Sequence, residues 1–296
     1  NVSRIIKEEI DGVEQCAKDS TPIPKPTQKP MMITRLFILT ARTWKASIRN
    51  ANSMLLRSLA AIGIALLVGM VFFQQPNNAT SSDNRIRSLL FLICVFALFC
   101  VPAISKFIEE RLLYNREHAG HVYGPLEYLL SSWAVEVPTL LAVVLLYGII
   151  SYWMVGLNPG ADRFFFFLLI IFLVIQTGFS IAQLISALVT SVNMAIATFF
   201  VVLVYSLLLG GMLISKSELP QELQWATRTS YLYYGYETLV INEFDQRSFG
   251  TEEIKWAGFD ELEPTQLKWT NAGSLAGWIV VLNCLIYLAL RFLHRE

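Results

Sequence analysis

One uncharged stretch constrains this chain more than any other feature. From Phe164 to Ser215, 52 consecutive residues contain no Asp, Glu, Lys or Arg. A soluble fold of that length must turn a polar face towards water. Over all 296 residues, 54% are apolar and 16% are charged, against about 25% charged in an average soluble domain. These features exclude an ordinary soluble globule and a disordered chain, and they indicate a membrane protein.

Charge and cysteine content narrow the function classes further. The chain has 23 basic and 23 acidic residues, so it lacks the basic surface of a nucleic-acid-binding protein, and we expect no nucleic-acid partner. Its four cysteines contain no Cys-x-x-Cys pair, so we expect no metal site and no cofactor in this chain.

Six apolar segments are long enough to cross a membrane, because about 20 helical residues span a hydrocarbon core of ~30 Å. The uncharged stretch exceeds one crossing and must therefore contain two helices, with a polar turn near Thr190 and Ser191. We predict an all-α integral membrane fold with six transmembrane helices, at about residues 53–73, 88–105, 128–155, 163–189, 193–214 and 269–290.

Two regions beside these spans are expected to be helical as well. Residues 32–50 separate an apolar face from a basic face at helical spacing, which predicts an amphipathic helix along the inner leaflet. A soluble helix packed on a core is the alternative. In the outer loop, residues 215–268, an aromatic cluster predicts that residues 221–241 re-enter the outer leaflet as short helices, since Trp and Tyr favour the headgroup level.

The distribution of Lys and Arg predicts the orientation. With the N-terminus in the cytosol, the inner segments carry 14 of these residues and the outer segments carry 8. We therefore expect both termini to be cytosolic, in a multi-pass protein of the plasma membrane. Asn78 begins an Asn-x-Thr sequence on the predicted outer side and is a glycosylation candidate.

Glu136 and Asn193 are the candidate intramembrane polar site residues. Placing the charged side chain of Glu136 in the hydrocarbon core costs free energy, so this side chain should face the protein or the headgroups. A polar relay to Asn193 or to Arg57 and a shallow position are both open.

After the second span, Lys106 and Glu110 are four residues apart and can pair on a helix that continues into the cytosol. That helix either transmits motion or is a solvated charged segment.

Several short pieces of sequence, in register, resemble the membrane half of ATP-binding cassette transporters of the G (white, pleiotropic drug resistance) subfamily. No single piece is specific, but together they extend over nearly the whole chain. The pieces are Glu109-Glu110-Arg111, Arg116-Glu117, Tyr123-Gly124, Glu136-Val-Pro138, Tyr152 to Leu157, Gly210-Gly211, Leu219-Pro220, Trp225, Ser230, Tyr234 to Glu237 and Asn242-Glu-Phe244.

The resemblance implies an ABC-2 type exporter membrane domain that works with an ATPase domain fused upstream, where ATP and Mg²⁺ would bind. This sequence has no Gly-x-x-x-x-Gly-Lys-Ser/Thr loop, so the chain itself has no ATPase site. Residues 1–31 contain four closely spaced prolines and are expected to be the cytosolic linker from that missing domain, followed by the transmembrane domain over residues 32–296.

The resemblance also implies site residues. Two halves would form a homo- or heterodimer around a central cavity, lined by apolar side chains of the second and fifth spans: Phe96, Leu98, Phe99, Phe199, Val202, Leu203 and Leu207. The alternative is that many of these face lipid or neighbouring helices. At the outer end of span five the family has an apolar plug, which corresponds here to a valve formed by Gly210, Gly211, Met212 and Leu213.

A further group of residues is implied to couple the membrane domain to the ATPase. It comprises Glu110, Arg111, Arg116, Glu117 and Tyr123. The function predicted from the sequence is the membrane-spanning half of an ATP-driven exporter that moves lipid, sterol or other hydrophobic compounds by alternating access. The alternative is an inactive or accessory membrane partner that kept the fold but has no motor.

Overall fold

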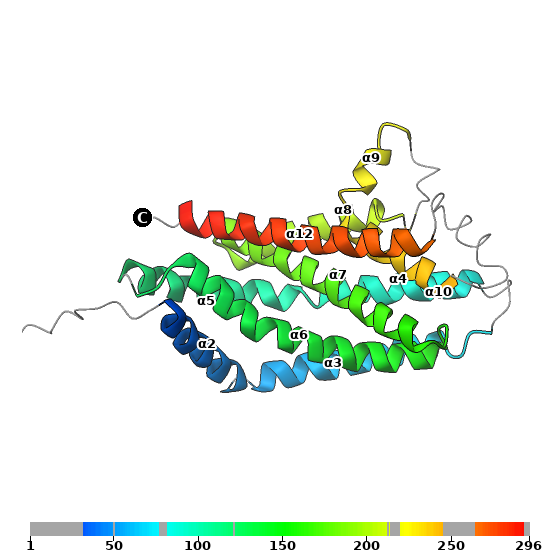
Figure 1. The fold of residues 1–296 in the computed structure, drawn as a ribbon, viewed down its shortest axis with the longest axis horizontal. Helices are drawn as coiled ribbons and strands as arrows, with labels where there is room; N and C mark the ends of the chain where they lie inside the picture. Colours follow the sequence, from blue (N-terminus) through cyan, green and yellow to red (C-terminus); the bar gives the residue numbers. More distant parts are fainter. Residues whose placement is uncertain are drawn as a thin grey trace, which may run out of the picture. The chain divides into compact units, whose positions relative to one another are not determined.

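The structure is a computed structural model that describes residues 32–49, 51–76, 82–120, 122–211, 213, 220–244 and 264–292. The chain divides into two compact units, residues 1–35 and 36–296, and the packing given below is that of the second. Within the described ranges all regular elements are helices (Figure 1): α2 (Met32–Arg49), α3 (Ala51–Val71), α4 (Ser82–Leu98), α5 (Val101–Ala119), α6 (Pro125–Val155), α7 (Ala161–Leu188), α8 (Val192–Leu208), α9 (Gln224–Thr227), α10 (Tyr231–Phe244) and α12 (Pro264–Phe292).

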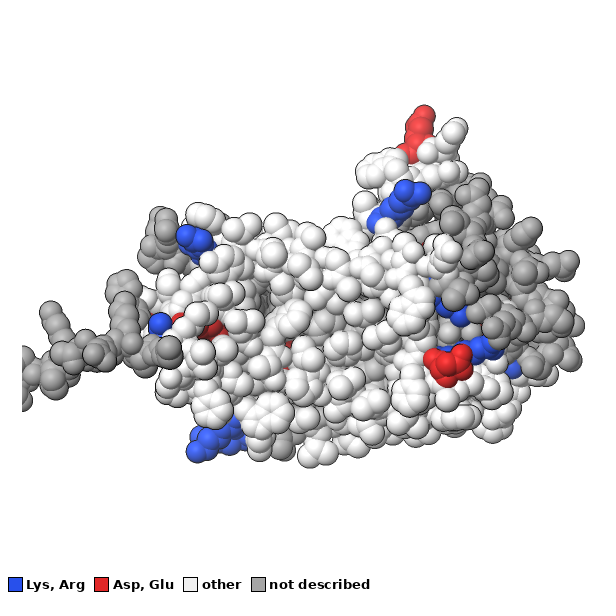
Figure 2. All heavy atoms as spheres, viewed as in Figure 1, with Lys and Arg blue, Asp and Glu red and all other residues white. Residues whose placement is uncertain are grey.

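The helices confirm the predicted all-α membrane fold. Five segments are long and apolar enough to cross a bilayer: Met54–Val71, Ser82–Ala119, Pro125–Val155, Ala161–Leu188 and Gln266–Phe292. The sixth apolar helix, α8, is shorter, with 17 residues. On the face shown in Figure 2, most charged side chains lie towards the two ends of the bundle, with a mainly uncharged band between them. The chain is therefore an integral, multi-pass membrane protein.

The fifth span is shorter than the sequence predicted. We expected a helix over residues 193–214, but α8 ends at Leu208. The chain then turns through Gly210 and Gly211, and Gly211 has a φ of 68°, a left-handed conformation that glycine adopts without steric cost. Because residues 209–214 are apolar in composition, the sequence did not indicate that the helix ends before them.

The second span contains a break that the sequence did not predict. The expected span at residues 88–105 is divided between α4 and α5, with a turn at Phe99 and Cys100. Pro102 lies in the first turn of α5, where its missing N–H needs no intrahelical partner. The predicted continuation into a charged helix is present as α5, which runs on to Ala119.

Helix–helix packing depends on small residues at two close contacts. A Cβ atom added at Gly148 of α6 would lie 2.3 Å from Leu168 of α7. One added at Gly235 of α10 would lie 2.4 Å from Val174 of α7. Glycine therefore allows α6 and α10 to approach α7. Helix α7 also packs along α12 and α5, which places it at the centre of the core.

The turn between α5 and α6 is fixed by the cap of α6. Gly124 is the N-cap residue, and its N–H donates a 2.7 Å hydrogen bond to Glu127. Pro125 follows at the first helical position, where proline is favoured. Short helices predicted within residues 221–241 are present as α9 and α10, and α10 continues to Phe244. The amphipathic helix predicted near residue 32 is present as α2.

Candidate functional site

A carboxylate inside helix α6 organises the charged end of the bundle. Glu136 is 3% exposed. Its Oε1 lies 3.3 Å from Nη1 of Arg57 on α3, and its Oε2 lies 2.6 Å from Nζ of Lys106 on α5. Two cations from two helices therefore compensate one buried charge, which a membrane span tolerates only when it is paired.

Of the two polar partners that the sequence left open, Arg57 is the one that Glu136 contacts. Glu136 forms the predicted relay with Arg57, and it gains Lys106 as a second partner. Asn193 is exposed at the start of α8, and no hydrogen bond joins it to Glu136 among the described residues. The predicted helical pair of Lys106 and Glu110 is present but longer, at 3.9 Å.

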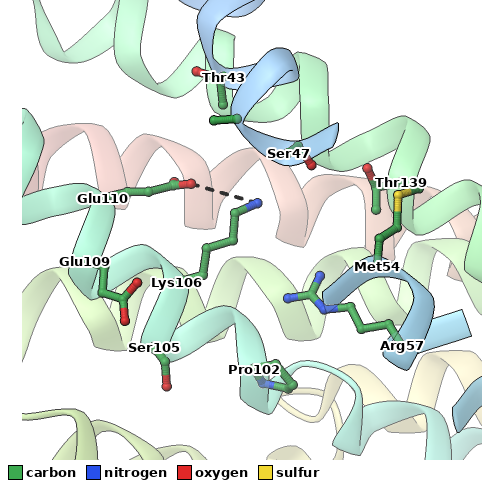
Figure 3. A pocket seen from close by; sticks show the side chains of 11 residues that line it. Thr43, Ser47, Met54, Arg57, Pro102, Ser105, Lys106, Glu109, Glu110 and Thr139 are labelled. Carbon is green, nitrogen blue, oxygen red and sulfur yellow. Dashed lines mark ion pairs between the residues drawn. The ribbon is translucent and has the colours of Figure 1, made fainter. Parts of the chain in front are cut away.

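A pocket of about 350 Å³ lies next to this carboxylate, among α2, α3, α5 and α6. Figure 3 shows Arg57 and Lys106 pointing into the same space from α3 and α5. The lining residues are Thr43, Ala46, Ser47, Met54, Arg57, Pro102, Ser105, Lys106, Glu109, Glu110 and Thr139. Because its walls contain cations, carboxylates and hydroxyl groups, the pocket is suited to a polar group.

A second charged contact joins α2 to α5. Arg42 Nη1 lies 2.8 Å from Glu117 Oε1. The hydroxyl of Tyr123, in the α5–α6 turn, donates a 2.7 Å hydrogen bond to Glu117 Oε2. Burial and the neighbouring Glu117 carboxylate raise the pKa of Tyr123, so its phenol stays protonated as a donor. Glu117 and Tyr123, predicted as coupling residues, are thus brought together.

The other predicted coupling residues lie apart from this pair. Arg111 is buried, and its Nη1 donates to the carbonyl oxygens of Ser186 at 2.5 Å and Ala187 at 2.9 Å, at the C-terminal end of α7. A cation is favourable there because the last carbonyls of a helix lack intrahelical donors. Arg116 is exposed, and its side chain forms no ion pair with a residue that the structure describes. Coupling roles remain predictions for all five residues.

At the opposite end of the bundle is a buried ion pair that the sequence analysis missed. Arg85 Nη1 of α4 lies 2.7 Å from Glu243 Oε1 of α10. Arg85 also donates to the carbonyl oxygens of Gln75, Pro76 and Gly156, in the loops after α3 and α6. The only sequence signal was Glu243 within the Asn-Glu-Phe piece. Through Arg85, helix α10 is therefore connected to the loop after α3 and to the loop after α6.

The predicted cavity residues differ in exposure. Phe96, Phe199 and Leu203 are buried inside the chain, and the ring of Phe96 lies 4.2 Å from that of Tyr147. These three pack against helices of their own chain in this structure. Leu98 is exposed, and Phe99, Val202 and Leu207 are half-buried. The apolar pattern alone could not separate core from surface, because both are apolar in a membrane protein.

The predicted valve is described in part. Gly210 and Gly211 are buried, and Leu213 is 63% exposed. Met212 and the glycosylation candidate Asn78 lie outside the described residues.

Comparisons with known proteins place this geometry in context. The sequence pattern of the family described as ABC-2 type transporter matches residues 34–244. ABC transporter G family member 18 of Arabidopsis thaliana is 32% identical over 73% of this chain and 30% of its own length. ABC transporter G family member 22 of Dictyostelium discoideum is 28% identical over 90% of this chain and 44% of its own length.

A nematode protein is similar too. The ABC transporter ATP-binding protein/permease wht-1 of Caenorhabditis elegans is 29% identical over 72% of this chain and 32% of its own length. The chain thus spans less than half the length of these curated relatives.

Proposed function

The chain belongs to the ABC-2 type transporter family, as a membrane domain of the G-family ATP-binding cassette kind, and from this premise we propose that it is the membrane-spanning half of an ATP-driven exporter. The proposed cargo is a lipid, a sterol or another hydrophobic compound. The proposed partners are a second transmembrane half and an ATPase domain in the same protein.

ATP chemistry does not fit the residues of this chain. The sequence contains no phosphate-binding Gly-x-x-x-x-Gly-Lys-Ser/Thr loop. The two buried arginines of the described part are already engaged, Arg85 by Glu243 and Arg111 by the carbonyls that end α7. ATP and Mg²⁺ are therefore proposed to bind only in the separate ATPase domain, and the role of this chain is to receive its motion.

The observation that best supports a coupling role is the link from α2 through Glu117 to the α5–α6 turn. Glu117 binds Arg42 on one side and Tyr123 on the other, so the turn cannot shift without pulling α2 and α5. Arg111 fixes α5 to the end of α7. A push on this turn would therefore reach three helices as one rigid unit.

Export then requires a cavity between two such halves that opens alternately to each side. Of the predicted wall, the exposed Leu98 and the half-buried Phe99, Val202 and Leu207 are available on the surface of the single chain. Apolar walls would hold a hydrophobic cargo by buried area, at roughly 25 cal/mol per Å². Leu213 is exposed beside the Gly210-Gly211 turn and is proposed, with Met212, to meet its counterpart in the partner and close the outer end.

The test is ATP-driven transport by the full-length protein in vesicles, measured together with ATP hydrolysis. Glu117→Gln and Arg42→Gln should each lower transport per ATP hydrolysed by roughly threefold, as expected for a partly exposed ion pair. The double variant should be no worse than either single variant, because both remove the same contact. Glu222→Gln, an exposed carboxylate near α9, is the matched control and should leave transport unchanged.

Two results would contradict this proposal. Additive losses in the double variant would show that Arg42 and Glu117 act separately. A wild-type protein that neither hydrolyses ATP nor transports would instead support the inactive, accessory partner.

A further inference from the structure

The polar pocket beside Glu136 lies outside the contacts that link Arg42, Glu117 and Tyr123. Ala46, Pro102 and Glu109 are exposed, so the pocket opens at the surface of the bundle. Its volume of about 350 Å³ is within the range of small-ligand sites, which begin at roughly 300 Å³. We infer that this pocket binds the headgroup of phosphatidylethanolamine from the surrounding leaflet.

The position of the pocket matches the headgroup level of a bilayer. Arg57 lies four residues into the helix segment Met54–Val71 that is apolar enough to cross the membrane. Helix α2, which supplies Ala46 and Ser47, exposes the apolar side chains of Phe37 and Trp44. An exposed tryptophan beside charged residues at the start of a span is typical of the membrane–water interface. The mouth of the pocket therefore meets lipid headgroups rather than bulk water.

The inner wall of the pocket is suited to a phosphate. Arg57 and Lys106 bring two positive charges to this wall; both lie beside Glu136, and Lys106 Nζ is also 3.9 Å from Glu110. The Nε of Arg57 is buried and has no hydrogen-bond acceptor among the described residues. A buried donor without an acceptor costs free energy, which a phosphate oxygen at the guanidinium would lower.

The outer wall is suited to an ammonium group. Glu109 and Glu110 follow Lys106 by three and four residues, which is about one turn or ~4.5–6 Å along α5 (Figure 3). Glu109 forms no ion pair with the residues that the structure describes. An ethanolamine headgroup has a phosphate and a primary ammonium joined by two carbons, so it can reach both walls. Its ammonium donates hydrogen bonds, whereas the quaternary ammonium of choline cannot.

Hydroxyl groups and apolar surface complete the site. Thr43 and Thr139 donate to carbonyl oxygens of their own helices, at 2.9 Å each. Ser47 and Ser105 also line the pocket, and their hydroxyls form no such bond in the described part. Helix α3 exposes Leu55 in the same turn as Arg57, which gives the acyl chains an apolar surface next to the mouth.

The experiment is native mass spectrometry of the purified full-length protein, titrated with dioleoyl phosphatidylethanolamine or dioleoyl phosphatidylcholine. The two lipids differ only in the headgroup. Wild-type protein should bind the ethanolamine lipid on the order of ten-fold more tightly, the gain expected from one charge-assisted hydrogen bond. Glu109→Gln should remove this preference. Asp162→Asn, an exposed acid at the opposite end of the bundle, should keep it.

A second variant tests whether the lipid headgroup occupies the pocket itself. Ala46→Trp places a large side chain at the mouth and should weaken binding of both lipids, while the elution volume of the protein stays unchanged. Equal affinity of wild-type protein for both lipids would overturn the inference, as would unchanged preference in Glu109→Gln or tighter binding of dioleoyl phosphatidylglycerol. Because lipid binding is measured without ATP and without transport, this inference and the proposed export function fail independently.

Discussion

Glu136 and Arg85 occupy the two ends of the bundle, and each is buried in an ion pair whose partner comes from another helix. Burying an unpaired charge is expensive, so removing one partner should cost more than removing an exposed pair. Exposure therefore ranks the charged residues by their expected effect on stability.

The first prediction concerns Glu136. Glu136→Gln leaves Arg57 and Lys106 without their shared carboxylate and should lower the free energy of unfolding by about 3 kcal/mol, the lower end for a broken buried pair. Asp83→Asn removes the exposed pair with Arg87 and should cost about 0.5 kcal/mol or less. Thermal unfolding of the full-length protein in detergent measures both. Equal shifts would show that Glu136 is solvated.

The second prediction concerns Arg85. Arg85→Lys keeps the charge but loses the planar group that reaches Glu243 and three carbonyl oxygens. We expect a loss of stability of about 2 kcal/mol in the same thermal assay. Arg87→Lys, two residues away and exposed, should stay within ±0.5 kcal/mol of the wild type. A lysine that restores full stability at position 85 would contradict the role of the carbonyl contacts.

The residues differ in how far sequence could predict their partners. The pair of Lys106 with Glu110 was expected from helical spacing. For Glu136, Arg57 was one of three options, beside Asn193 and a shallow position. Arg85 and Glu243 are 158 residues apart, and no local pattern connects them. For Lys106 the sequence predicted only the partner Glu110 on the same helix. Its contact with Glu136 was not predicted, because the sequence did not show that α5 and α6 lie side by side.

At the scale of elements, α5 differs from the other long helices because it starts apolar and ends charged. Its exposed face near Arg116 is available to a domain outside this chain, while Arg111 on the opposite face holds α7. The helix thus combines an internal anchor with an external surface.

The third prediction follows from that surface. Arg116→Glu reverses an exposed charge next to Glu117 and should lower transport by the full-length protein while leaving binding of the cargo intact. Because the side chain is exposed, the fold should not change. Arg228→Glu, an exposed residue after α9, serves as the charge-matched control. An equal loss of transport and of cargo binding would argue against a coupling role.

The fourth prediction concerns the segment after α8. Replacing Met212 and Leu213 together with Ala should reduce transport per ATP by roughly ten-fold, since each large apolar side chain contributes about 1.5–3 kcal/mol when buried. ATP hydrolysis should continue. Simultaneous measurement of hydrolysis and transport tests this, and unchanged coupling would eliminate the valve.

Sequence predicted the helices better than their ends. An apolar segment of sufficient length defines a span by itself, which is why α3, α6, α7 and α12 were found. The break between α4 and α5 and the early end of α8 depend on backbone turns at Phe99–Cys100 and Gly210–Gly211. Such turns hardly change the mean hydropathy of the segment, so a count of apolar residues does not detect them.

At the scale of the whole molecule, the unit formed by residues 36–296 has different charged contacts at its two ends. The end with α2 and the α5–α6 turn holds the contacts proposed for coupling and the polar pocket, whereas at the other end Arg85 joins α10 to the loops. Family membership was predictable because several motifs lie in register. The proposed dimer and its cavity depend on a second chain, which the sequence of one chain does not place.

The proposed export scheme requires an even number of membrane crossings, which puts the α5–α6 turn on the ATP side. Epitope tags at Asn1, after Gly120 and after Glu296, each in the full-length protein, can be probed with antibody in intact and in permeabilised cells. The account predicts that all three tags are reached only after permeabilisation. A tag after Glu296 that is reached in intact cells while the tag at Asn1 is not would make the number of crossings odd and would contradict the export scheme.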